Sequence, residues 1–165
     1  MTVDRAALVA GLEENLLRVV RAARAVPDPT RRPDGGWSAL DVVEHLVLTE
    51  RGVQRLIARA AGEEPSEVRT AEQAAIVEAV AAHPKKLQAP EFIAPTGRFA
   101  SLDEALRLFR EARGSSVDLA QALDVDFEAH HAPHPFFGVL DLAQWLRFLA
   151  THGERHAAQL DRLVG

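Results

Sequence analysis

The chain has 165 residues, 47% of them hydrophobic, and a formal net charge of −5, which is typical of a single globular domain spanning 1–165. It contains no cysteine, which excludes disulfides, thiolate metal ligands and a cysteine nucleophile. It also lacks a basic cluster, a signal-peptide block and any run of about 18 apolar residues, so we expect no nucleic-acid partner, no membrane association and a cytoplasmic location.

Four long helical segments are predicted along the chain. Leucine and valine recur at helical spacing over 4–25, and this pattern ends at the proline-rich segment 27–36. Ser38 and Asp41 form a capping pattern that predicts a second helix reaching about Ala61. A capping box at Ser101 and Glu104 predicts a helix over 102–123, and helical periodicity resumes over 139–164.

The segments between these helices are less regular. Residues 71–82 could form a short amphipathic helix, whereas Pro84, Pro90, Pro95 and Gly97 predict an ordered loop or crossover. The segment 124–138 is predicted to be a loop, and no alternating β pattern of useful length appears. We therefore expect an all-α protein, an antiparallel four-helix bundle with a long crossover between the second and third long helices.

Two histidines on the last predicted helix, His152 and His156, could bind one metal ion because residues four apart share a helix face. A third ligand must come from elsewhere, and His45, at the edge of the buried side of the second helix, is the candidate. A zincin-type peptidase is not expected, because Gly153 follows His152 and Glu154 projects roughly 200° away from it. The alternative is that each histidine is a partly buried polar residue bonded to a neighbour.

Four further residues are candidates for supporting the metal ligands or lining a pocket. Gln159 could orient a ligand or could simply face solvent, and Thr49 lies near His45 on the second helix. His134 could line a pocket mouth or could brace the helix that follows. Trp145 shares a stripe with the two C-terminal histidines, but it is more typical of a core residue than of a substrate platform.

Two other features concern the chemistry of the expected site and the start of the second helix. Glu44 and Glu154 both project away from the expected metal-facing stripes, so no dedicated general base is identified. Trp37, directly before the second helix, is expected to act as a hydrophobic staple on its first turn.

The order of these motifs resembles that of the DinB-like superfamily. The resemblance is carried by Gly36-Trp37-Ser38, Glu44-His45-Leu46, His134-Pro-Phe-Phe-Gly138, Gln144-Trp-Leu146 and His152-Gly-Glu-Arg-His156-Ala-Ala-Gln159-Leu160. It implies a four-helix bundle with an up-down-down-up course and a divalent metal held by His45, His152 and His156. Three neutral imidazoles would leave coordination positions open for water and substrate, as in catalytic rather than structural sites.

The resemblance further implies a divalent-metal-dependent enzyme with a small-molecule substrate. It would transfer a low-molecular-weight thiol co-substrate of the bacillithiol or mycothiol type, or hydrolyse a small amide or ester. Zinc or nickel is the expected ion, with iron or copper also compatible, and a homodimer is expected. Two alternatives stay open: a non-catalytic stress-associated protein with a structural metal or none, and a small-molecule binding module that uses the bundle cleft without metal.

Overall fold

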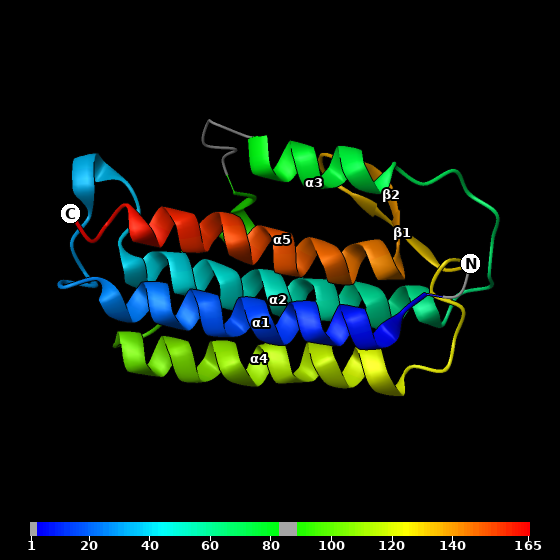
Figure 1. Ribbon diagram of the computed structural model, residues 1–165, viewed down its shortest axis with the longest axis horizontal. Coiled ribbons are helices and arrows are strands. Elements are labelled where there is room, and N and C mark those ends of the chain that lie inside the picture. The colour runs from blue at the N-terminus through cyan, green and yellow to red at the C-terminus, as the bar shows by residue number, and fades with distance from the viewer. Residues whose placement is uncertain (1–2, 83–88) are drawn as a thin grey trace.

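Four long helices form most of the computed structural model, which describes residues 3–82 and 89–165. They are α1 (Arg5–Ala25), α2 (Ala39–Ala61), α4 (Leu102–Ala122) and α5 (Leu142–Asp161). In Figure 1, α1 and α5 run in one direction while α2 and α4 run in the other. α1 and α2 each pack against both α4 and α5. The prediction of a helical bundle is therefore confirmed.

Local capping explains why the long helices begin where they do. The Asp4 carboxylate accepts a hydrogen bond from the Ala7 amide at the start of α1. Ser38 and Asp41 form a reciprocal capping box at the start of α2, and Asp141 forms another with Gln144 at the start of α5. These side chains satisfy amide groups that the first helical turn leaves without partners, so each start is fixed by a few neighbouring residues.

The prediction that no strand is present was wrong. A short antiparallel hairpin, β1 (His131–His134) and β2 (Gly138–Asp141), pairs His131 with Asp141 and His134 with Gly138. As a result α5 begins at Leu142, three residues later than expected. Strands of four residues are too short to show an alternating pattern, and Gly138, with φ of 78°, takes the left-handed conformation that the turn requires.

The connection between α2 and α4 contains one confirmed helix. α3 (Gln73–Ala82) covers the outer side of α5 and buries Ile76 and Val80. A single 3-10 turn, η2 (Glu91–Ile93), follows, and another, η1 (Pro33–Gly35), precedes α2. Pro84 falls within 83–88, outside the described residues, so the full course of the crossover stays a prediction. Among the helices of the described part, none is long and apolar enough to cross a membrane.

The core of the bundle consists of two apolar clusters. One contains Leu12, Ile57 and Leu149, together with residues of α3 and the hairpin. The other contains Val19, Leu46 and Leu160. Along α1, α2 and α5, the residues between these clusters are therefore the places where polar side chains can be buried without interrupting either core.

Polar residues occupy this intermediate layer. Arg113 of α4, which is only 1% exposed, donates from Nε to Glu50 Oε1 at 2.8 Å. Its Nη1 group donates to the Leu12 carbonyl oxygen at 2.7 Å and to Asn15 Oδ1 at 3.1 Å. On α5 the layer falls between Leu149 and Ala157, which is where the two C-terminal histidines are found.

Candidate metal centre

Three histidines from two helices meet inside the bundle. His45 comes from α2, and His152 and His156 come from successive turns of α5. His152 Nε2 lies 3.2 Å from His45 Nε2 and 3.1 Å from His156 Nε2. Side chains 107 residues apart in sequence are thus brought together, and this is the only metal-competent group of His, Cys, Asp and Glu side chains found among the described residues.

The remaining ring nitrogens of two of these histidines have acceptor partners. His45 Nδ1 donates to the Ile93 carbonyl oxygen at 2.9 Å, and His156 Nδ1 donates to Gln159 Oε1 at 2.8 Å. Because both partners are oxygen acceptors, the proton of each neutral ring sits on Nδ1. Each Nε2 atom therefore directs a lone pair toward His152, which is the form of imidazole that binds a metal.

Burial favours the neutral form of all three rings. Burial lowers the pKa of His45 even though its bond to Ile93 opposes the shift. Burial, followed by the proximity of His156 and His45, holds the pKa of His152 well below its ordinary value. Burial and the nearby His45 lower the pKa of His156 to about 3. At neutral pH a cation would not have to displace protons from these rings.

The donor set fits a divalent cation. Three neutral nitrogen donors suit zinc, nickel, iron or copper better than magnesium or calcium, which prefer oxygen. A tetrahedral zinc ion with Zn–N distances of about 2.0–2.1 Å would place its ligand nitrogens roughly 3.3 Å apart. The two Nε2 separations at His152, 3.1 and 3.2 Å, are close to that spacing.

Aromatic rings surround the three imidazoles. The Trp37 ring lies 4.9 Å from the His45 ring and is stacked at 6.2 Å on that of His156. The ring of Phe148 is stacked at 5.2 Å on that of His152. Trp37, for which a staple on the first turn of α2 was expected, lies against the histidine cluster.

The structure places the other predicted residues in distinct environments. Gln159 contacts His156 directly, as described above. Thr49 is buried one helical turn after His45, and its hydroxyl has no hydrogen-bond partner among the described residues. Trp145 is a buried core residue whose indole N–H donates to the Ala132 carbonyl oxygen at 3.1 Å. His134 Nδ1 accepts from the amides of Phe136 and Phe137, so this histidine closes the hairpin turn.

One residue near the cluster has a contact that the sequence did not reveal. Glu44 is fully buried, and its carboxylate accepts hydrogen bonds from three successive backbone amides, those of residues 96–98. These amides belong to the connection before α4, the same connection whose Ile93 carbonyl oxygen accepts from His45. Glu154 is exposed and lies 3.4 Å from Arg18. In the sequence, the only signal for the contact of Glu44 is that this acidic residue directly precedes His45, which was expected at the edge of the buried side of the second helix.

Comparisons with known proteins agree with this architecture. The model of the DinB superfamily matches residues 5–160. The uncharacterised protein YuaE of Bacillus subtilis (strain 168) is 26% identical over 130 residues, covering 77% of this chain and 76% of that protein. The solved structure of YfiT from Bacillus subtilis, reported as "a probable metal-dependent hydrolase with an unusual four-helix bundle topology", has a TM-score of 0.68 at 20% identity, covering 99% of this chain and 88% of that one. Because the family model matches nearly the whole chain, this protein belongs to the DinB superfamily.

Proposed function

We propose that the protein is a divalent-metal-dependent enzyme whose metal ligands are His45, His152 and His156. The observation that carries the proposal is the convergence of their Nε2 atoms, with the Nδ1 protons of two rings engaged by oxygen acceptors. The Nε2 lone pairs of His45 and His156 both face Nε2 of His152, and such lone pairs are stabilised at this separation by a cation or a proton lying between them. A purely structural role for neutral histidines would not require this arrangement.

A metal ion with three neutral ligands would supply Lewis acidity, by polarising a carbonyl group or lowering the pKa of a water or a thiol. The protein would hold the ligand rings rigid through Gln159 and Ile93 and limit water access with Trp37 and Phe148. The Thr49 hydroxyl lies one turn from His45 and has no partner among the described residues, so it is available to hydrogen-bond a ligand bound beside the three histidines.

The reaction we favour is hydrolysis of a small amide or ester. The description of YfiT as a probable metal-dependent hydrolase supports it. Thiol transfer is the second reaction, and since the chain contains no cysteine, the thiol would have to come from a low-molecular-weight co-substrate. We further propose that the enzyme acts on a small-molecule substrate, that its four long helices follow an up-down-down-up course, and that it is a cytoplasmic homodimer, as expected from the sequence.

The first test is metal content by inductively coupled plasma mass spectrometry on protein purified without a histidine tag. We expect about one zinc or nickel ion per chain in the wild type and none in His45→Ala or His156→Ala. His130→Ala is the matched control, because His130 is also buried but donates to the Ala60 carbonyl oxygen, outside the cluster. Failure of the wild type to bind either ion after reconstitution would refute the proposal.

A second measurement separates a catalytic centre from a structural one. Cobalt-substituted protein should change its visible absorption spectrum when azide or 2-mercaptoethanol is added, because three protein ligands leave a coordination position open. A spectrum unchanged by either compound, with tightly bound metal, would favour the non-catalytic alternative.

A further inference from the structure

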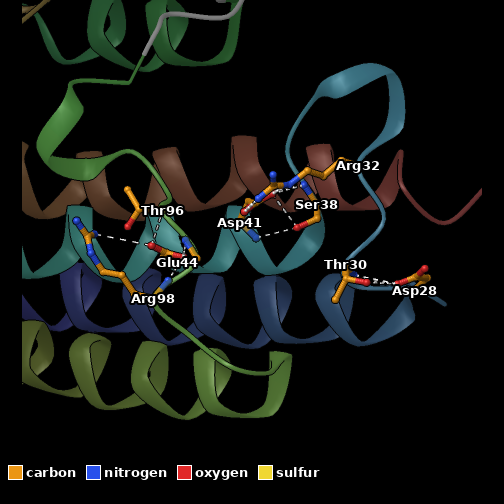
Figure 2. Close-up of polar contacts among 9 residues, drawn as sticks. Asp28, Thr30, Arg32, Ser38, Asp41, Glu44, Thr96 and Arg98 are labelled. Carbon is orange, nitrogen blue, oxygen red and sulfur yellow. Dashed lines mark hydrogen bonds and ion pairs between the residues drawn. The ribbon is translucent and has the colours of Figure 1, made fainter.

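Glu44 and His45 hold the same short segment of the chain. Glu44 Oε1 accepts from the Thr96 amide at 2.8 Å, and its Oε2 accepts from the amides of Gly97 and Arg98, both at 3.1 Å. The Arg98 guanidinium lies 3.8 Å from the same carboxylate. Figure 2 shows the Glu44 side chain reaching from α2 to these residues. His45 meets the segment three residues earlier, at the Ile93 carbonyl oxygen.

The backbone of this segment is shaped to bind a carboxylate. Three successive amides point at Glu44, and Gly97 in the middle has φ of 77°, a left-handed conformation that favours glycine. Successive amides arranged around a left-handed residue form a concave anion site. Here the anion is a buried side chain of the protein itself, so the arrangement attaches the segment to α2.

A carboxylate suits this position better than an amide. An ionised carboxylate only accepts hydrogen bonds, and it has enough lone pairs for all three amides and the guanidinium. A glutamine would direct its own N–H₂ group at one or two of those donors. Replacing Glu44 by Gln therefore keeps the size of the side chain but breaks part of the attachment.

We infer that Glu44 is a positioning residue for the metal centre: it attaches residues 96–98 to α2 and so keeps the Ile93 carbonyl oxygen against His45 Nδ1. That carbonyl fixes the His45 proton on Nδ1 and leaves the Nε2 lone pair facing His152. If the segment moves away, His45 loses its acceptor, and its ring is free to rotate and to carry the proton on Nε2. The inference rests on the proposed metal site.

The test begins with metal-free protein and uses long-range ¹H–¹⁵N spectra of the histidine rings. These spectra report which nitrogen carries the proton. In the wild type, His45 should be protonated on Nδ1. In Glu44→Gln we expect a mixture of the two tautomers, or the Nε2-protonated form.

Zinc affinity, measured by competition with a chromophoric chelator, is the second measurement. Loss of a partner that orients a metal ligand typically costs about 10- to 100-fold in affinity, and we expect that range for Glu44→Gln. Gly97→Ala should act in the same direction, because it keeps the carboxylate but strains the left-handed backbone. It also carries the test if Glu44→Gln does not fold.

Glu104→Gln is the matched control. Glu104 also accepts a backbone amide of this connection, that of Ala100 at 2.8 Å, but it does so at the start of α4. It should leave both the tautomer and the zinc affinity unchanged. A folded Glu44→Gln or Gly97→Ala protein with the wild-type His45 tautomer and zinc affinity would overturn the inference. If the wild type binds neither zinc nor nickel, the metal proposal fails, while the tautomer of the metal-free protein still tests the link between Glu44 and His45.

Discussion

Replacing Gly153 by alanine should destabilise the protein, although alanine is the better helix former. Gly153 lies on α5 directly after His152 and is buried against α1. A Cβ atom there would overlap Asn15 Oδ1 and lie 2.9 Å from Asn15 Cγ. Asn15 is itself only 6% exposed, and its Oδ1 atom accepts from the buried Arg113. The side chain therefore has little room to move aside.

The expected size of the effect follows from three contributions. Overpacking a buried site costs about 1–3 kcal/mol. Breaking the hydrogen bond between Asn15 and the charged Arg113 costs about 1.5–3 kcal/mol. The higher helix propensity of alanine returns about 1 kcal/mol. We expect a net loss of roughly 1.5–5 kcal/mol in the free energy of unfolding, together with weaker metal binding if His152 is displaced.

Urea denaturation followed by circular dichroism measures the effect. Gly114→Ala on α4 is the matched control, because a Cβ atom there meets nothing within 4 Å, and it should stabilise the protein by up to about 1 kcal/mol. In an Asn15→Ala background, Gly153→Ala should cost less, since the atoms that it would overlap are gone. A Gly153→Ala protein as stable as Gly114→Ala would refute this reasoning.

Two further predictions concern the buried polar groups. Arg113→Met should lower the free energy of unfolding, measured in urea, by about 3–5 kcal/mol, because it leaves the Glu50 carboxylate buried without its partner. The double variant with Glu50→Leu should recover most of that loss. No recovery would contradict the argument that the two side chains stabilise each other as a pair. Metal-free protein should lose stability as pH falls from 7.5 to 5.5. Burial lowers the pKa of His156 to about 3 and that of His134 to about 4, so the unfolded chain takes up these protons first as pH drops below about 6.5. Each such histidine adds up to about 1.4 kcal/mol per pH unit to the slope of the free energy of unfolding against pH. His134→Gln should remove one of these contributions. A free energy of unfolding that is flat between pH 7.5 and 5.5 would refute the lowered pKa values of these histidines.

Local patterns in the sequence were sufficient for the long helices. Ser38 and Ser101 cap amides within three residues of themselves, and the apolar periodicity of 4–25 begins near its cap, so helix starts were predicted to within one or two residues for α1, α2 and α4. The start of α5 was misplaced because β2, which pairs with a strand outside the helix, takes residues 138–141. A four-residue strand acquires its identity from its partner and not from its own periodicity.

The histidine pair on α5 was likewise predicted from local spacing, since residues four apart share a helix face in any bundle. Spacing alone did not single out His45 as the third member of the cluster. His45 was the candidate because of its place at the edge of the buried side of the second helix, and the resemblance of the motifs implied the same residue. The structure brings the His45 ring to the other two. Periodicity gives the face on which a residue lies but not which residue of another helix it meets.

The sequence by itself determined where the long helices lie, which faces they bury and that two histidines share one of those faces, because each depends on interactions within a few residues. Only the tertiary structure decided what supports the histidines and what separates the two apolar clusters. The Ile93 carbonyl oxygen is 48 residues from His45, the Glu44 carboxylate binds amides 52–54 residues away, and Arg113 joins α4 to α1 and α2. Contacts at such separations depend on how the helices pack against one another, and no local pattern of residues encodes that packing.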